Sequence, residues 1–392
     1  MKKIITSLLL LATSSIISAQ SSLDSILASV LKNNKTLAAY TQYNTAQTLQ
    51  YKTGLTPSDP VAEYDYLFGN NTAIGDQVEF SITQSFDFPT VYGKRKDVSE
   101  SNIAQLEFKM IAQRQDILFD AETVYLEIIY RNKLNLYYQD RKNALEKLVT
   151  DFKTKLDKGD GNILDVNKSR LNLIEINKLY NENISTASQL HQHLIELNGG
   201  VTISISDTLY PVAEALSPFE VLEQEYEKND PFRKILEQEK IIAQRELELR
   251  KALWLPKVET GYHYQGFLGE TYQGIHAGIS IPLWENKNIV SAQESYIAYT
   301  DVNLQSHINE HYYEIKEMYE RYFSLTVSLE EYRKIFDDVS NKLLLDKALE
   351  LGQINVIEYF LEISFFDDAL MNYLETENEY YKIIALLNKY KL

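Results

Sequence analysis

The chain has 392 residues, a formal net charge of −17 and no cysteine. Its acidic balance argues against nucleic acid as a partner, because a negatively charged surface repels phosphates. The lack of cysteine excludes disulfides, thiol nucleophiles and thiolate metal ligands, and it leaves no site for lipid attachment behind a signal peptide.

The first residues have the composition of a secretory signal peptide. Lys2 and Lys3 precede an apolar stretch over 4–17, and Ser18 and Ala19 follow, which is the usual order in such signals. We predict that 1–19 is removed, which takes away two lysines and no acid and changes the net charge to −19. A buried N-terminal strand or helix is the alternative. No second apolar run of this length occurs, so any membrane crossing by the mature chain must use strands.

A β-hairpin is predicted over about 60–88. From Asp76 to Phe88, five even positions carry apolar residues and every odd position is polar; the apolar residues are Val78, Phe80, Ile82, Phe86 and Phe88. Such alternation is typical of a strand with one apolar and one polar face. The preceding residues 61–68 alternate in the same way, and Gly69, Asn70 and Asn71 supply the turn between the two strands.

Two long helices are predicted after this hairpin. No proline occurs over 90–210, and Gly159 and Gly161 are the only glycines over 94–198. Because proline and glycine are the usual helix breakers, the segment predicts a helix over about 92–156, a sharp fold near these glycines, and a second helix. The first helix would be roughly 100 Å long at about 1.5 Å per residue, which is more than a compact globule needs.

A linker over 198–217 and a second hairpin over about 256–282 are predicted next. A glycine pair followed by alternating Val201, Ile203 and Ile205 suggests one short strand in the linker. In the hairpin, we place Gly269 and Glu270 at the turn. In this register Val258 is opposite Ile281 and His263 is opposite His276, and each face of the hairpin is uniformly apolar or polar.

A second pair of long helices is predicted after Pro282, where Gly352 is the only glycine. Apolar residues there recur in alternating steps of four and three, as in a coiled coil. This seam consists of Leu304, Ile308, His311, Ile315, Met318, Tyr322, Leu325, Leu329, Tyr332, Phe336, Val339 and Leu343. A looser seam in the first long helix consists of Ile103, Leu106, Met110, Ile117, Ala121, Val124 and Ile128.

The two halves of the chain match at a nearly fixed spacing. Phe88-Pro89 and Ile281-Pro282 end the two hairpins 193 residues apart, while 32–34 resembles 228–230 at an offset of 196. The residues that correspond at an offset of 193 near the helix turns are Gly159, Asn162, Leu164 and Asp165 with Gly352, Asn355, Ile357 and Glu358. We therefore predict one repeat over 20–197 and another over 218–392, each with the order helix, hairpin, long helix, helix.

Four amphipathic strands are too few to close a membrane barrel, since the smallest have about eight. In hydrocarbon every backbone polar group needs a partner, so the strands of several identical chains would have to form one ring. Three chains would supply twelve strands. The fold class is therefore an α+β membrane protein, mainly of long helices, with an internal two-fold duplication. A soluble antiparallel sheet covered by helices is the alternative.

The duplicated order of elements, with the two glycine–asparagine turns, resembles the TolC family of outer-membrane efflux proteins. The resemblance implies a homotrimer with a twelve-stranded β-barrel in outer-membrane lipid and a coiled-coil α-barrel crossing the periplasm. It also implies a passive exit channel for substrates that an inner-membrane pump delivers through a periplasmic adaptor. A secreted or periplasmic coiled-coil scaffold without channel activity is the rival interpretation.

In that family the turns between paired helices form the periplasmic tip that contacts the adaptor. The matching residues here are Gly159, Gly161, Asn162, Asp165, Gly352 and Asn355. Glycine permits a tight turn and asparagine caps the following helix, so ordinary helix punctuation also explains these residues. Glu358 occupies the position of the first acid in the family's pore constriction, whereas Leu361 stands where a second acid is common.

Glu259, His263 and His276 are candidates for the barrel lumen. They could also bind a transition metal weakly, but a wetted polar lining is the better explanation, and we predict no metal site. No grouping of nucleophile, base and orienting residue occurs, and no phosphate-binding glycine loop. We therefore expect no catalytic residues, no cofactor and no enzyme activity.

Overall fold

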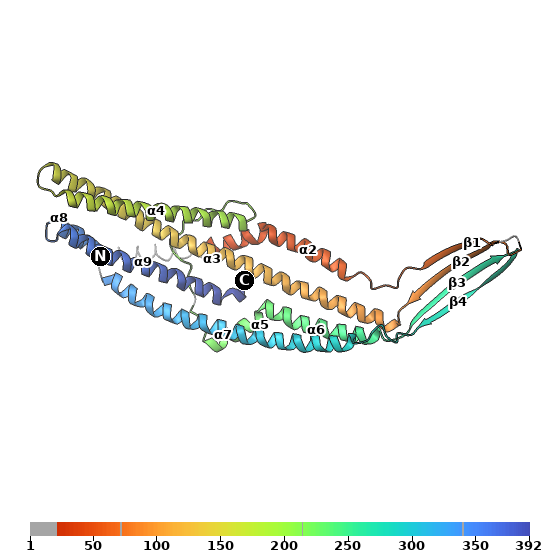
Figure 1. Cartoon of the computed structure of the whole chain (residues 1–392). Coiled ribbons are helices and arrows are strands. Elements are labelled where there is room, and N and C mark those ends of the chain that lie inside the picture. Colours follow the sequence, from red (N-terminus) through yellow and green to blue (C-terminus); the bar gives the residue numbers. More distant parts are fainter. Residues whose placement is uncertain (1–21, 71–72, 214, 339–340) are drawn as a thin grey trace. The chain divides into compact units, whose positions relative to one another are not determined.

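The computed structural model describes residues 22–70, 73–213, 215–338 and 341–392 (Figure 1). The predicted signal peptide, Asn71 and Val339 lie outside these residues. Two compact units are present: one takes in the chain up to Ala38 with Gln113–Asn229 and Tyr312–Leu392, and the other comprises Ala39–Ala112 and Asp230–His311. No helix among the described residues combines the length and apolar character needed to cross a membrane.

The second half of the chain repeats the order of elements in the first half. After a helical segment over 22–33, the helices are α2 (Lys35–Tyr51), α3 (Pro89–Asp157), α4 (Ile163–Leu197), α5 (Phe219–Asn229), α6 (Pro231–Ala252), α7 (Ile289–Asp338), α8 (Asn341–Glu350), α9 (Val356–Leu387) and the short 3-10 helix η1 (Lys389–Lys391). The strands are β1 (Val61–Leu67), β2 (Gln77–Phe86), β3 (Lys257–Phe267) and β4 (Glu270–Ser280). In each half, two short helices precede a hairpin, and long helices follow it.

One residue in each half both interrupts the leading helix and caps the next one. The Asn34 side chain accepts a hydrogen bond from the Leu37 N–H at 2.8 Å. Asp230, 196 residues later, accepts hydrogen bonds from the N–H groups of Phe232 and Arg233 at 2.9 and 3.0 Å. Such side chains satisfy N–H groups that a helix start leaves unpaired. The duplication therefore extends to individual hydrogen bonds.

The seams predicted for the long helices are confirmed by burial. In α3, 69 residues long, the seam side chains are buried or half-buried, and so are the described members of the seam in α7. α7 is described to Asp338 and α8 from Asn341, and the two residues between them lie outside the described part of the chain. Period-3.5 apolar patterns bury one helix stripe against neighbouring helices, which explains this agreement.

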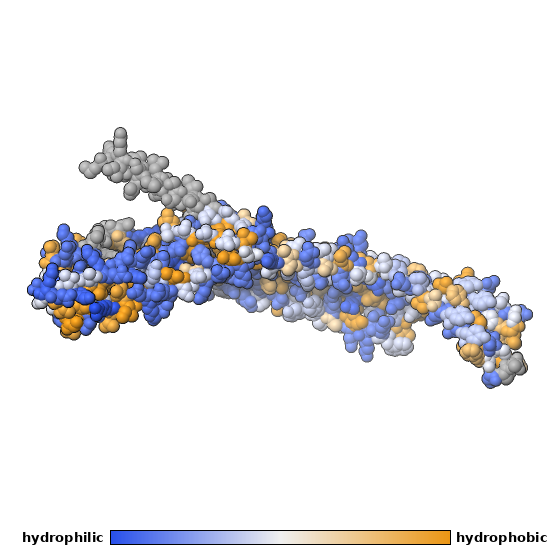
Figure 2. All heavy atoms as spheres, turned by 90° about the horizontal axis from the view of Figure 1, so that it is seen from above, coloured by the Kyte–Doolittle hydropathy of each residue, from blue (hydrophilic) through white to orange (hydrophobic). Residues whose placement is uncertain are grey.

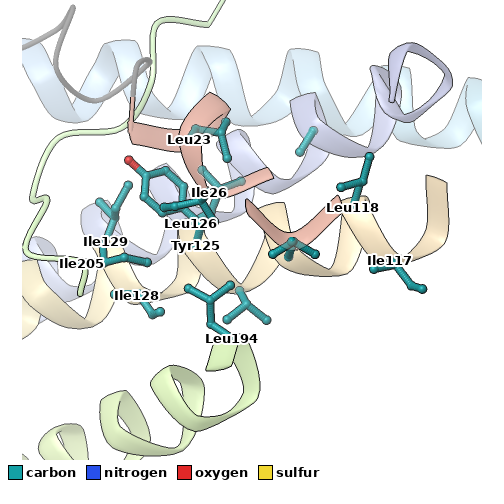
Figure 3. Packing of buried hydrophobic residues seen from close by; sticks show 14 of the residues in the cluster. Leu23, Ile26, Ile117, Leu118, Tyr125, Leu126, Ile128, Ile129, Leu194 and Ile205 are labelled. Carbon is teal, nitrogen blue, oxygen red and sulfur yellow. The ribbon is translucent and has the colours of Figure 1, made fainter. Parts of the chain in front are cut away.

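The core of the first unit is built around the middle of α3 (Figure 3). Tyr125, Ile128 and Ile129 are fully buried there and pack with Leu23 of the N-terminal helical segment and Leu194 of α4. Burying side chains of this size contributes about 1.5–3 kcal/mol each. This cluster joins segments far apart in the sequence.

The prediction of a short strand in the linker is wrong. The described residues over 201–218 contain neither helix nor strand. Ile205 is buried in the same core as α3, Ile203 packs against it, and Val201 is exposed. The alternation therefore reflects one buried side of an irregular segment, held in part by the Asn198 amide, which donates a hydrogen bond to the Val201 carbonyl at 2.8 Å.

The four strands form one antiparallel sheet in the order β1-β2-β3-β4. Pairing of β2 with β3 joins the two hairpins, and one row across the sheet consists of Ala62, Ile82, Tyr262 and Ile275. The next row, on the opposite face, begins with Glu63 and continues through Ser81 and His263 to Gly274. The sheet thus has one largely apolar and one largely polar face, as the alternation of residues within each strand predicted.

Both hairpins differ from the prediction at their turns. β1 and β2 are joined by a longer connection than the predicted turn, because Leu67 pairs with Gln77. In the second hairpin Val258 pairs with Ile279, so the predicted register is wrong by two residues. A shift of two residues leaves every side chain on its predicted face, since side chains alternate with a period of two.

Leu268 explains the error in the second hairpin. Leu268 and Gly269 occupy the turn with φ of 50° and 85°, the pattern of a type I′ turn, which strongly favours Asn-Gly. A leucine in this left-handed region costs about 1–2 kcal/mol. The predicted turn at Gly269 and Glu270 lies one residue later than the observed turn.

We therefore predict that Leu268→Asn stabilises the protein by about 0.5–1 kcal/mol, because asparagine tolerates positive φ. The measurement is the unfolding midpoint of the full chain in detergent. Leu283→Asn provides the control, since it makes the same change at an exposed leucine without positive φ. An equal effect of both substitutions would show that polarity, and not backbone strain, is responsible.

Candidate functional site

The turn between α3 and α4 depends on two glycines with different requirements. Gly159 has φ of 82°, and its N–H donates to the Leu156 carbonyl while the Asp160 N–H donates to the Lys155 carbonyl, both at 3.0 Å. This pair of bonds defines a Schellman helix end, in which a left-handed glycine satisfies the last carbonyls. A Cβ atom at Gly161 would lie 2.5 Å from the Leu156 nitrogen. No side chain fits at Gly161.

The turn between α8 and α9 ends its helix in the same way. Gly352 has φ of 68°, and its N–H donates to the Leu349 carbonyl at 3.1 Å. The Gln353 N–H donates to the Ala348 carbonyl at 2.8 Å. Ile354 stands where the first turn has Gly161, and its side chain packs partly buried among apolar neighbours. The two turns are therefore the same motif with one local difference.

Asparagine caps the helix that follows each turn, as predicted. Asn162 accepts a hydrogen bond from the Leu164 N–H at 2.9 Å. Asn355 accepts two, from the N–H groups of Ile357 and Glu358, both at 2.9 Å. The Glu358 carboxylate in turn accepts from the Asn355 N–H at 2.9 Å, which completes a capping box. Glu358 thus has a structural role that sequence reasoning did not identify.

The two turns line one cavity of about 380 Å³ in the first unit. Five of the residues predicted for the tip lie on its wall, namely Gly161, Asn162, Asp165, Gly352 and Asn355. Gly159 and Glu358 belong to the same turns but do not line the cavity. The structure therefore brings together residues that lie about half the chain apart in the sequence.

Sequence reasoning missed the exposed apolar side chains of these turns. Leu164 is 67% exposed and Ile357 63%, at positions that correspond in the two repeats. Ile163 and Leu351 beside them are also exposed. Grouped apolar side chains on a surface are characteristic of protein contacts. The period of the helix would have shown that Leu164 and Ile357 lie off the buried stripe.

An ion pair between a buried arginine and a half-buried aspartate joins α3 to α9. The Arg141 side chain of α3 is 4% exposed, and its Nε lies 3.2 Å from the Asp367 carboxylate of α9. Arg141 also donates to the Tyr359 hydroxyl at 3.5 Å, and that hydroxyl donates to Asp346 at 2.8 Å. Burial raises the pKa of Tyr359 to about 12, so it remains a neutral donor. These contacts link α3, α8 and α9.

We predict that Arg141→Ala destabilises the protein by about 3 kcal/mol, because it leaves the Asp367 carboxylate without its guanidinium partner. The double variant Arg141→Met, Asp367→Leu should recover most of this loss, since it removes both charges. The measurement is the free energy of unfolding in urea.

The exposed pair Lys178–Glu182, 3.7 Å apart, provides the control. Lys178→Ala should cost less than about 0.5 kcal/mol, as is usual for a solvated ion pair. A double variant at Arg141 and Asp367 that is no more stable than Arg141→Ala would contradict the role of the charge pair.

The three residues predicted for the lumen lie on the polar face of the sheet. His276 lies 3.1 Å from Glu259, and His263 lies 4.0 Å from Glu79 of β2. The predicted opposition of the two histidines is wrong, because His276 pairs across the strands with Gly261. No group of three or more metal-binding side chains occurs in the described part of the chain.

The apolar face of the sheet is exposed. Ile275 is 88% exposed, and Tyr64, Ile82, Tyr262 and Ile279 are also exposed. Figure 2 shows hydrophobic atoms at the surface of the strand region, at the right of the view. Neither β1 nor β4 has a second neighbouring strand among the described residues. Within the described chain, the sheet therefore has an exposed apolar face and two edges without a strand partner.

Several solved structures of membrane proteins share the fold of this chain. No family model matches the chain, and no curated protein matches its sequence. The structure of CusC, described in connection with transmembrane channel formation, superposes with a TM-score of 0.77 at 15% identity and covers 95% of this chain and 92% of CusC. The Campylobacter jejuni CmeC outer membrane channel gives 0.71 at 15% identity, with coverages of 94% and 85%.

The outer membrane protein VceC of Vibrio cholerae also shares the fold. Its TM-score is 0.71 at 13% identity, over 94% of this chain and 95% of VceC. CmeC is described as an outer membrane channel and VceC as an outer membrane protein. The similarity spans nearly the full length of both partners, so it concerns the whole arrangement of helices and strands.

Proposed function

Because the chain has the TolC-family fold of outer-membrane efflux channels, we propose that it is one subunit of an outer-membrane exit channel. Three copies would place their strands in the outer membrane and extend their long helices into the periplasm. The observation that carries this proposal is the four-stranded sheet, with its exposed apolar face and two unpaired edges.

The edges favour a closed ring of copies. Strands alternate in direction across the sheet, so β1 and β4 run in opposite directions. β4 of one copy can therefore pair antiparallel with β1 of the next, and the ring closes without a free edge. In lipid an unpaired edge costs several kcal/mol per backbone group. Three copies give twelve strands, above the minimum of about eight.

In this ring the apolar face contacts lipid and the polar face lines the passage. Glu259, His263 and His276 then lie in the lumen, where water solvates them. The exposed Ile275 and Tyr64 lie on the opposite face, as a lipid-facing surface requires.

We further propose that the paired helix turns contact a periplasmic adaptor, which connects the channel to an inner-membrane pump. The exposed Leu164 and Ile357 offer apolar contact area, and the Schellman and capping motifs pair backbone groups at the ends of the helices that flank the turns. The residues that shape the turns at this contact are Gly159, Gly161, Asn162, Asp165, Gly352 and Asn355. In this assignment the glycines shape the turns, and the apolar side chains provide the binding energy.

The channel proposal predicts opposite outcomes for two adjacent residues of β4. Ile275→Lys places a charge on the lipid-facing side, at a cost of about 2–4 kcal/mol near the bilayer midplane. We expect this variant to be lost from the outer-membrane fraction. His276→Lys, on the polar face beside Glu259, should reach the membrane as wild type does.

A coiled-coil scaffold in the periplasm would tolerate both substitutions equally. Mass measurement of the wild-type protein in detergent completes this test, with three subunits per particle as the expected result. A soluble monomer would exclude the channel.

Glu358 is proposed to form the pore constriction. Three copies of this carboxylate around the axis would attract cations. Glu358→Gln retains a side chain suited to the capping box, so it removes the charge and preserves the turn. We expect reduced cation selectivity in the reversal potential across planar bilayers. Unchanged selectivity would restrict Glu358 to its capping role.

A further inference from the structure

A second cavity in the first unit has a different character from the one at the turns. It measures about 460 Å³, within the size range of small-molecule sites. Its walls come from the N-terminal helical segment, α3, the irregular segment over 211–213, α9 and η1. The described lining residues are Leu23, Glu122, Leu126, Pro211, Val212, Ala213, Tyr381, Ile384, Ala385, Asn388 and Lys391.

Glu122 is the one acid among these described lining residues. Over the described part of the chain, no hydrogen bond or ion pair holds its carboxylate. Burial, together with the nearby charge of Asp24, raises its pKa to about 7. Both burial and a neighbouring acid disfavour the charged form of a carboxylate that has no cation beside it. A perturbed acid in the wall of a cavity is a typical sign of a binding site.

The other charged and polar groups of the cavity do not supply that cation. Lys391 has its ammonium 5.6 Å from the centre of the Tyr390 ring and forms no ion pair with Glu122 in the described structure. The Asn388 amide donates to the Ile384 carbonyl at 3.0 Å. Tyr381 is neutral, because burial raises its pKa. A metal ion does not fit, since no group of three suitable ligands is found in the described residues.

We propose that this cavity binds a small amphipathic amine, with its ammonium group beside Glu122 and its apolar part against Leu126, Ile384 and Ala385. The ammonium supplies the missing charge to the carboxylate, and the apolar part covers a lining that is mainly aliphatic. A charge-assisted hydrogen bond in such surroundings contributes more than the same bond in water. The cavity shares no lining residue with the cavity at the paired turns.

The test uses 1-naphthylmethylamine as the probe and 1-naphthylmethanol as its uncharged counterpart. Binding to the full chain in non-ionic detergent is followed by naphthalene fluorescence anisotropy at pH 8. Glu122→Gln keeps the shape of the side chain and removes its charge. We expect this variant to bind the amine at least about tenfold more weakly, and we expect wild type to prefer the amine over the alcohol by a similar factor.

Glu146→Gln is the matched control, because Glu146 is an exposed acid on the same helix. It should bind the amine as wild type does, which also corrects for partitioning of the probe into detergent. Lowering the pH from 8 to 6 should weaken binding to wild type, since Glu122 becomes protonated while the amine stays charged. This pH dependence should be absent in Glu122→Gln.

Equal binding of amine and alcohol, or equal binding by wild type and Glu122→Gln, would overturn the proposal. Normal circular dichroism of the variant excludes misfolding as the cause of any loss. If Glu122→Gln changes the number of subunits per particle but not amine binding, a second copy covers the cavity, and the proposal is also wrong. None of these measurements depends on conductance, so this proposal and that of the exit channel succeed or fail separately.

Discussion

The need to satisfy backbone hydrogen bonds at the two edges of the sheet governs the rest of this protein. β1 and β4 each pair with a strand on one side only within the described chain. The unpaired N–H and C=O groups of such an exposed edge can pair with a strand of another chain. The helices of the chain leave the apolar face of the sheet uncovered, as the 88% exposure of Ile275 shows. In the proposed channel, a ring of copies in lipid would satisfy both the edges and the face, so that one subunit alone would be an incomplete structure.

Local signals in the sequence predicted much of the fold because they report local physics. Gly159 and Gly352 adopt positive φ at helix ends, and Asn162 and Asn355 cap the next helices. The apolar periods of two and of about three and a half identified the strands and the buried stripes of the long helices. These features depend on residues only a few positions apart, so one sequence was sufficient to find them.

The errors and omissions arose where distant residues decide the outcome. The prediction of a strand in the linker was wrong because Ile205 is buried in a core formed around α3 and not against a neighbouring strand. Leu268 takes a left-handed conformation that its own preference opposes, so pairing along β3 and β4 outweighs the local cost. The capping role of Glu358 and the cavity beside Glu122 required coordinates, because each depends on which side chains meet in space.

The capping box of Glu358 does not exclude a role in the pore. One carboxylate oxygen accepts the Asn355 N–H, and a carboxylate has more acceptor sites than this bond uses. The N-terminus of α9 also carries a partial positive charge that stabilises an acid in its first turn. In a ring of three copies, each helix end would therefore offset part of the repulsion among the three carboxylates. The cap would thus hold the Glu358 carboxylate in a fixed position, which a constriction formed by three such groups requires.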